Sequence, residues 1–265
     1  MDLGLKDKRA LVTGSTAGIG LATAEALARE GAHVIINGRA EARVGAAVSR
    51  LKQALGAAAR IEGVAADLSG AEGCARVIEA YPQLDVLVNN MGIFEPKVFA
   101  EISDADWLRF FESNVMSGIR LSRHYVRGMR EQNWGRIVFV SSESALQIPT
   151  EMIHYGVTKT AQLAVARGLA ETLVGSNVTV NSVLPGPTAS EGVAGFVAQL
   201  AASSGKSAAQ VEKEFFREAR PSSVLQRFTQ PAEVAALITY VCSTQSSATT
   251  GAALRADGGV VRAIV

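Results

Sequence analysis

A tyrosine and a lysine with the spacing needed for proton transfer lie in one helix-like segment. Tyr155 and Lys159 belong to the run Tyr155-Gly156-Val157-Thr158-Lys159. Residues four apart share a helix face, so the phenol and the ammonium group can point at one site. A nearby cation stabilises the phenolate and lowers the pKa of a tyrosine from its usual value of about 10. Tyr155 is therefore a candidate general acid or base, although such pairs also occur by chance in many helices.

A serine upstream could complete this arrangement. Ser142 follows Ser141 at the carboxyl end of a predicted strand, 13 residues before Tyr155. A hydroxyl group there can hydrogen-bond a substrate carbonyl oxygen beside the tyrosine. The alternative is that the two serines only cap the end of the strand.

A glycine-rich loop joins the first predicted strand to a helix. It reads Thr13-Gly14-Ser15-Thr16-Ala17-Gly18-Ile19-Gly20. Glycines permit a tight turn and a close approach of the backbone to a phosphate. The free amides and the positive dipole end of the helix can then bind a pyrophosphate. The loop therefore predicts a dinucleotide site, although structural turns also use glycine.

The second predicted strand indicates which dinucleotide binds. It ends in Ile35-Ile36-Asn37-Gly38-Arg39, without an acidic residue. An acidic residue near this place usually meets a free ribose 2′-hydroxyl, whereas an arginine suits a 2′-phosphate. Arg39 therefore favours NADP(H), with NAD(H) as the alternative cofactor. An exposed arginine at a helix start is the structural alternative.

The elements that must position these residues alternate between short strands and longer helices. The expected strands cover residues 10–13, 33–37, 61–65, 86–89, 136–140, 178–184 and 253–256. The expected helices cover residues 19–30, 41–55, 72–81, 104–131, 152–174 and 231–243. Continuous apolar strands are typical of a parallel sheet buried on both faces. The pattern predicts an α/β fold: a Rossmann-type, doubly wound parallel sheet of about seven strands in three α/β/α layers.

One segment interrupts this alternation. After Pro185-Gly186-Pro187, a helical pattern extends from residue 191 to 220. Its apolar residues form two patches on either side of Ser203-Ser204-Gly205-Lys206-Ser207: Val193, Phe196, Val197 and Leu200, then Val211, Phe215 and Phe216. Ligands of open α/β sheets bind beyond the carboxyl ends of the strands. We expect a substrate lid at about residues 189–224, within a single domain spanning 1–265. Two amphipathic surface helices are the structural alternative.

Composition excludes several other classes. Among 265 residues, 48% are hydrophobic and the formal net charge is +1, which excludes intrinsic disorder. No basic run indicates nucleic-acid binding, and no apolar run of about 18 residues indicates a membrane span. Cys74 and Cys242 have no metal-ligand spacing, so no metal site is expected. The first residues do not resemble a signal peptide, so we expect a cytoplasmic protein.

These motifs together resemble those of the short-chain dehydrogenase/reductase family, in its single-domain branch and near its 3-oxoacyl-carrier-protein reductases. The resemblance covers residues 6 to about 260. The motifs, in chain order, are the 14–20 loop; Asp67 with Leu68; Asn89-Asn90-Met91-Gly92; Asn114; Ser142; Tyr155 with Lys159; Asn181; Pro185-Gly186; and Asp257-Gly258-Gly259. Two departures are Met91, where the family usually has alanine, and Ala17, where many NADP-preferring members have a basic residue.

The resemblance implies a role for each matching residue. Tyr155 is the general acid/base, Lys159 lowers its pKa and binds the nicotinamide ribose, and Ser142 polarises the carbonyl. Asn114 helps to hold a water in a proton relay to Lys159. The implied cofactor-binding residues are Gly14, Ser15, Thr16, Gly18, Ile19, Gly20, Arg39, Asp67, Leu68, Asn89, Gly92, Tyr155, Lys159, Pro185, Gly186 and Thr188.

The implied reaction is hydride transfer between NADP(H) and a carbonyl or secondary alcohol, with a ketone or 3-oxoacyl compound reduced. The expected substrate-binding residues are Phe94, Ser142, Ser144, Ile148, Met152 and Tyr155, which favour an apolar substrate. The sequence alone does not place Glu143 and Glu151 relative to the pocket, and His154 is expected at the surface or in an interface. A homotetramer, or a homodimer, is expected. The alternatives are a non-catalytic NADP(H)-binding regulator and an NAD-linked alcohol or sugar dehydrogenase of the same fold.

Overall fold

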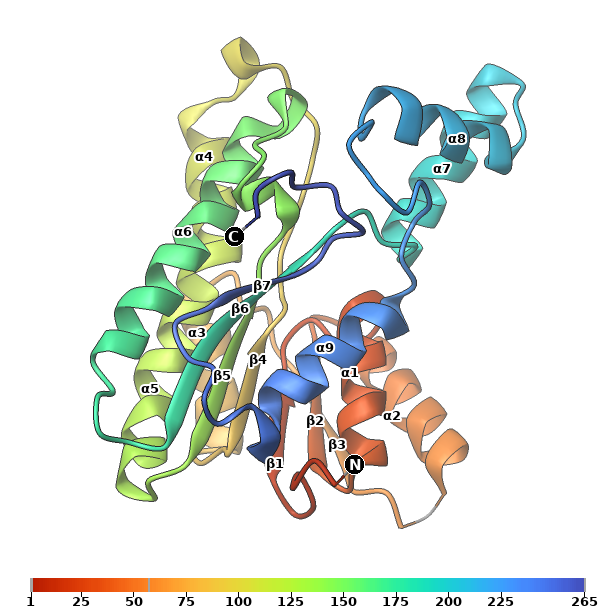
Figure 1. Ribbon diagram of the computed structural model, residues 1–265. Coiled ribbons are helices and arrows are strands. Elements are labelled where there is room, and N and C mark those ends of the chain that lie inside the picture. Colours follow the sequence, from red (N-terminus) through yellow and green to blue (C-terminus); the bar gives the residue numbers. More distant parts are fainter. Residues whose placement is uncertain (1, 57, 265) are drawn as a thin grey trace.

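The structure, a computed structural model, describes residues 2–56 and 58–264, and only the backbone of residues 196, 199, 200 and 202–204. In this part of the chain, seven parallel strands form one sheet in the order β3-β2-β1-β4-β5-β6-β7 (Figure 1). The strands are β1 (Arg9–Val12), β2 (His33–Gly38), β3 (Ile61–Ala65), β4 (Val86–Asn89), β5 (Gly135–Val140), β6 (Val178–Pro185) and β7 (Ala253–Ala256). The predicted parallel α/β sheet is confirmed, with strand ends shifted by one residue at most.

Helices cover both faces of the sheet (Figure 1). They are α1 (Gly18–Arg29), α2 (Glu41–Leu55), α3 (Ala71–Ala80), α4 (Asp104–Phe111), α5 (Ser117–Glu131), α6 (Ile153–Glu171), α7 (Glu191–Ser204), α8 (Ala208–Glu218) and α9 (Pro231–Cys242). Successive strand residues point to opposite faces. In β1, Ala10 and Val12 therefore join a core with α1, α2 and α9. Leu11 joins a second core with α3, α5 and α6. The three predicted layers are confirmed.

One predicted helix is interrupted. The segment expected to be a single helix over residues 104–131 contains a π-helical segment, η2 (Glu112–Met116), between α4 and α5. The side chain of Asn114 in this segment bonds both backbone groups of Ile93. A π-helical turn widens the helix, and such turns are frequent at functional sites. Its effect is to bring Asn114 to the end of β4.

The chain order across the sheet changes direction between β1 and β4. At such a switch point the connections leave toward opposite faces, and a crevice opens beyond the carboxyl ends of the strands. The glycine-rich loop follows β1 at this point. In Figure 1, α7 and α8, drawn in cyan to blue, lie beyond this end of the sheet.

The predicted insertion forms these two helices. Gly205 ends α7 with φ +67, and Ser207 begins α8 with a capping box. Val211 and Phe216 of the predicted second patch are buried. The rings of Phe215 and Phe228 stack with centroids 5.2 Å apart. The side chains of Phe196 and Leu200, from the first patch, lie outside the described residues. Among the described helices, none combines the length and apolar character needed to cross a membrane.

Candidate active site

A cavity of about 860 Å³ opens at the carboxyl ends of the strands. It is lined from the α1 loop by Ala17, Gly18, Ile19 and Gly20; after β4 by Asn90, Gly92, Ile93, Phe94 and Pro96; after β5 by Ser141, Ser142, Glu143 and Ser144; from α6 by Tyr155 and Lys159; and after β6 by Pro185, Gly186, Pro187 and Thr188. Segments far apart in the sequence thus meet around one space. Of the predicted catalytic residues, Ser142, Tyr155 and Lys159 line this space together with the glycine-rich loop, whereas Asn114 is not in the lining.

The glycine-rich loop has the shape of an anion cradle. Gly14 and Gly18 have φ angles of +59 and +56, in the region that favours glycine. A Cβ atom on Gly20 would lie 2.5 Å from both Gly14 O and Asn90 Nδ2. Ala17 precedes α1 without a side-chain cap. The first amides of α1 are therefore left for a ligand, and the loop fits the pyrophosphate of a dinucleotide.

Asn90 and Thr13 hold this loop to the sheet. The Asn90 side-chain amide donates to Thr13 O at 2.9 Å and to Gly14 O at 3.0 Å. Thr13 Oγ1 accepts from the amides of Asn90 and Met91, both at 2.9 Å. The sequence pointed instead to Asn89, which donates to Ser122 Oγ beneath the sheet end. The side chains of adjacent strand residues point in opposite directions. The Asn-Asn pair therefore indicated that one asparagine holds the loop, but not which of the two.

Ser15 and Asn37 fix the base of the loop. The hydroxyl of Ser15 donates to Val12 O at 2.6 Å and accepts from Asn37 N at 3.0 Å. Asn37 Oδ1 accepts from Gly14 N at 3.2 Å. The side chain of Ser15, predicted to bind the cofactor, is thus turned into the sheet and is buried. Its role is to shape the loop.

The remaining predicted cofactor residues lie after β2 and β3. Thr16 packs against Gly38, whose added Cβ would lie 2.5 Å from Thr16 Cγ2. Arg39 is exposed directly after β2. Asp67 Oδ1 accepts from the amide and the hydroxyl of Ser69, and Leu68 is buried. These positions lie at the same end of the sheet as the glycine-rich loop.

The predicted proton-transfer residues come together across β5 and α6. Lys159 Nζ lies 5.6 Å from the centroid of the Tyr155 ring and donates to Val140 O at 3.0 Å. Ser142 caps the 3₁₀ turn η3 (Glu143–Ala145), where its hydroxyl accepts from Ser144 N at 3.1 Å. The same hydroxyl donates to Glu143 Oε2 at 2.5 Å.

Burial, and not Lys159, dominates the electrostatics of Tyr155. Burial raises the pKa of Tyr155 above its usual value, and the Glu143 carboxylate raises it further. A hydrogen bond with Ser142 and the charge of Arg220 act in the lowering direction. Burial also lowers the pKa of Lys159 to about 8. Lys159 is not among the groups that shift the pKa of Tyr155 here, so the expected lowering of that pKa by Lys159 stays a prediction.

Gln162 connects Lys159 to Asn114. Gln162 Oε1 accepts from Lys159 Nζ at 3.3 Å, and Gln162 Nε2 donates to Asn114 O at 2.5 Å. Asn114 Nδ2 also donates to Thr158 Oγ1 at 3.0 Å. No sequence motif singles out Gln162, although its place three residues after Lys159 puts both on one face of α6.

The substrate end of the cavity differs in part from expectation. Phe94, Ser144 and Met152 line it, and the rings of Phe94 and Tyr155 are 6.4 Å apart. Ile148 instead packs on Gly156, whose added Cβ would lie 2.8 Å from Ile148 Cγ2. The expected surface position of His154 is wrong: its ring is buried, 4.0 Å from the ring of Phe110.

Three charged residues complete this end of the cavity. They are Glu143, Glu151 and Arg220, which all line it. Arg220 was missed because it lies 77 residues from Glu143, its partner.

After β6, Thr188 Oγ1 bonds Gly186 O at 2.9 Å and Thr229 Oγ1 at 3.0 Å.

Comparisons with known proteins agree with this geometry. The family model described as enoyl-(acyl carrier protein) reductase matches residues 14–261. The uncharacterized oxidoreductase YvaG of Bacillus subtilis is 49% identical, with all of both chains covered. The 3-oxoacyl-[acyl-carrier-protein] reductase FabG of Aquifex aeolicus is 33% identical over 98% of this chain and 100% of its own. The L-sorbose reductase of Gluconobacter frateurii, solved with NADPH and L-sorbose, is 32% identical, with a TM-score of 0.94 and full coverage of both chains. The chain therefore belongs to the short-chain dehydrogenase/reductase family of NAD(P)-dependent oxidoreductases.

Proposed function

We propose that this protein is an NADP(H)-dependent carbonyl reductase that converts a ketone to a secondary alcohol. The observation that carries this proposal is the convergence of Ser142, Tyr155 and Lys159 on the cavity that the glycine-rich loop also lines. A regulator that only binds a dinucleotide needs the loop and can use Lys159 to hold the nicotinamide ribose, but it has no use for Ser142 or for a proton donor at Tyr155. Their convergence favours the enzyme over the regulator.

The cofactor would lie between the glycine-rich loop and α6. The first amides of α1 would hold its pyrophosphate, and Arg39 would meet a 2′-phosphate at the end of β2. The L-sorbose reductase was solved with NADPH, which supports the same choice here. When bound, the nicotinamide supplies the hydride that reduces the carbonyl carbon. The acidic residue that suits a free 2′-hydroxyl is absent from the segment 35–39, which disfavours NAD(H).

The protein's own residues supply hydrogen bonds and a proton. Tyr155 donates its phenolic proton to the carbonyl oxygen as negative charge develops there. Because burial and Glu143 keep the pKa of Tyr155 above its usual value, the phenol is protonated at neutral pH and ready to act as an acid. Ser142 donates a second hydrogen bond to the same oxygen once its hydroxyl rotates away from Glu143. The protonated phenol is the form that carbonyl reduction requires.

The substrate is a small neutral ketone. Apolar Phe94, Met152 and Phe215 line its end of the cavity. The charged residues in the described lining are five carboxylates and two cations: Glu143, Glu151, Glu191, Glu214 and Glu218, with Lys159 and Arg220. All five carboxylates are ion-paired: Glu191, Glu214 and Glu218 with Arg43, Lys206 and Arg217, and both Glu143 and Glu151 with Arg220. The choice of a small neutral ketone therefore rests on the apolar lining and not on charge. The 3-oxoacyl compound, supported by the FabG relative, is the second candidate.

The α7–α8 segment is the proposed lid. Val193 of α7 and Val211 and Phe215 of α8 line the cavity from the side opposite Tyr155's own helix. The segment is joined to the sheet through the bridge between Thr188 and Thr229. Apolar side chains brought over a bound ketone would exclude water from the reacting carbon.

Fluorescence titration with NADPH and NADH, followed by NADPH oxidation with neutral ketones, hydroxyketones and 3-oxoacyl thioesters, tests the proposal. We expect tighter binding of NADPH and turnover of a neutral ketone. Tyr155→Phe should retain the fold and NADPH binding but lose turnover, whereas Tyr240→Phe, at an exposed tyrosine of α9, should behave as wild type. Unchanged turnover in Tyr155→Phe would remove Tyr155 as the acid, and binding without any turnover would favour the regulator.

A further inference from the structure

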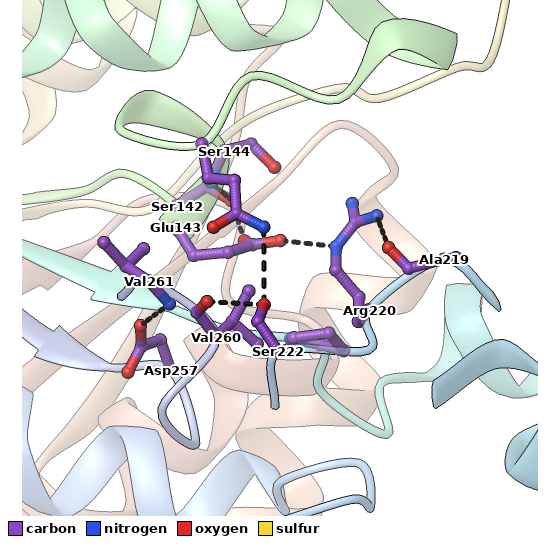
Figure 2. A network of polar contacts seen from close by, with 12 residues as sticks. Ser142, Glu143, Ser144, Ala219, Arg220, Ser222, Asp257, Val260 and Val261 are labelled. Carbon is purple, nitrogen blue, oxygen red and sulfur yellow. Dashed lines mark hydrogen bonds and ion pairs between the residues drawn. The ribbon is translucent and has the colours of Figure 1, made fainter. Parts of the chain in front are cut away.

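A buried ion pair lies beside the catalytic serine. Arg220 Nε donates to Glu143 Oε1 at 3.1 Å, with side chains only 10% and 6% exposed (Figure 2). Arg220 Nη1 also lies 3.4 Å from Glu151 Oε1. Two charges withdrawn from water to this extent contribute little net stability. Removing one of them leaves the other uncompensated, which is strongly unfavourable. The pair therefore calls for a role other than stability.

The second oxygen of Glu143 controls Ser142. Ser142 Oγ donates to Glu143 Oε2 at 2.5 Å and accepts from Ser144 N at 3.1 Å. A serine hydroxyl has one proton and two lone pairs. Its proton is thus held by Glu143, and one acceptor site is occupied by Ser144. The position and direction of the Ser142 hydroxyl depend directly on where Glu143 lies.

Arg220 comes from a different part of the molecule. It follows α8, and its backbone amide bonds Phe215 O at 3.1 Å. Two residues later, Ser222 Oγ donates to Val260 O at 2.6 Å in the C-terminal loop. Figure 2 shows this contact beside Glu143 and Arg220. The side chain of Arg220 is therefore fixed where the proposed lid meets the C-terminal loop.

We propose that Glu143 and Arg220 are positioning residues that couple the seating of the α7–α8 segment to the orientation of Ser142. Arg220 holds Glu143, and Glu143 fixes the position of Ser142 Oγ, whose hydroxyl then turns from Glu143 to the substrate carbonyl. Ser142 is then correctly aligned only when α7–α8 is docked. The inference rests on the proposed carbonyl reduction, and it adds two residues, from η3 and from the end of α8, that act through Ser142.

The electrostatic surroundings of Tyr155 distinguish this coupling from a simple packing role. Three charged groups face Tyr155 from different elements: Glu143 from η3, Arg220 after α8 and Lys159 from α6. Glu143 raises the pKa of Tyr155, whereas Arg220 and a hydrogen bond with Ser142 lower it. Loss of Glu143's charge and loss of Arg220's charge should therefore shift the pKa of Tyr155 in opposite directions. A packing defect would not shift the pKa of Tyr155 in opposite directions in the two variants.

The test is a double-mutant cycle of Glu143→Gln and Arg220→Met. We expect kcat of each single variant to fall about tenfold to a hundredfold, because misplaced reacting groups cause losses of this order. The double variant should be no slower than the slower single variant, and the NADPH Kd should stay within about twofold of wild type. In alcohol oxidation, the acidic limb of kcat/KM should move to lower pH for Glu143→Gln and to higher pH for Arg220→Met.

The matched control is the ion pair of the same residue types on the outer face of α6. Arg167→Met and Glu171→Gln, separately and together, remove an exposed pair and should change neither kcat nor the pH profile. Should Gln or Met at the buried positions prevent folding, Glu143→Asp and Arg220→Lys keep the charges with altered reach. These conservative variants should also have a lower kcat, and the double variant should again be no slower than the slower single variant.

A readout without turnover separates this inference from the proposed function. Hydrogen exchange at the Ser144 amide should accelerate in both single variants, since that amide loses its acceptor when Ser142 is released. Faster exchange in an enzyme with no ketone turnover would overturn the proposed function and keep the coupling. Additive losses of kcat, pH shifts of the same sign, or unchanged Ser144 exchange would overturn the coupling.

Discussion

Gly20 provides a perturbation whose size follows from the atoms around it. In the first turn of α1, alanine would be the better helix former by about 1 kcal/mol. An added Cβ, however, would lie 2.5 Å from Gly14 O and from Asn90 Nδ2, and 2.8 Å from Ser15 Cα. Two of these three neighbours are main-chain atoms of the glycine-rich loop. The loop must therefore move if Gly20 is replaced by alanine.

The expected size combines two opposing contributions. Forcing a methyl group into a packed site typically destabilises by about 1–3 kcal/mol, and the rigid neighbours place Gly20→Ala near the upper end. After the gain in helix propensity, the net loss is about 2 kcal/mol, which lowers Tm by about 4–8 °C in a chain of this size. A displaced loop also loses a hydrogen bond to a charged phosphate, worth about 1.5–3 kcal/mol. The NADPH Kd should therefore rise at least about tenfold.

Thermal denaturation and fluorescence titration with NADPH measure both effects. Gly45→Ala is the matched control, because Gly45 lies in α2 with no atom within 4 Å of an added Cβ. It should raise stability by about 0.5–1 kcal/mol and leave NADPH binding unchanged. If Gly20→Ala keeps both the Tm and the NADPH affinity of wild type, the loop is not the tight cradle that its geometry indicates.

Three further changes test other parts of the site. Arg39→Ala should weaken NADPH by about tenfold to a hundredfold and NADH much less, as measured by titration; equal losses would refute a contact with the 2′-phosphate. Burial lowers the pKa of Lys159 from 10.5 to about 8, so between these pH values only the unfolded chain keeps the proton and stability rises with pH. In urea denaturation, the unfolding free energy of wild type should rise by up to about 3 kcal/mol relative to that of Lys159→Met between pH 7 and pH 10.5. If the unfolding free energies of the two proteins change equally with pH, the buried cation is contradicted. Gln162→Leu leaves the carbonyl of Asn114 buried without this donor and should cost about 1–3 kcal/mol of unfolding free energy, whereas exposed Gln53→Leu should be nearly neutral.

Local patterns were sufficient to predict the fold. Ile61–Ala65, Val86–Asn89 and Ala253–Ala256 occur as strands at the predicted residues. Strand and helix periodicities depend on neighbours within a few residues, and a glycine-rich turn between a strand and a helix is equally local. Helix 104–131 departs from its periodic pattern because Asn114 bonds the backbone of Ile93, which no local pattern contains.

Within the site, two things could not be predicted from the sequence: which side chain at a strand end points to which face of the sheet, and which residues far apart in the chain are in contact. Asn89 and Asn90 are indistinguishable by type, and only the strand's direction shows that Asn90 reaches the glycine-rich loop. His154 was predicted at the surface, but in the folded chain Phe110 packs against its ring and buries it. The pKa of Tyr155 depends on burial and on Glu143, which a sequence motif does not contain.

The sequence by itself determined the α/β fold, the glycine-rich loop and the identity of Ser142, Tyr155 and Lys159, because each depends on residue type and short spacing. Tertiary structure alone decided that Arg220 reaches Glu143 across 77 residues and that Glu143, held there, accepts a hydrogen bond from Ser142. The physical reason is that burial and charge act through space. Whether two charges compensate each other depends on which segments the fold brings together.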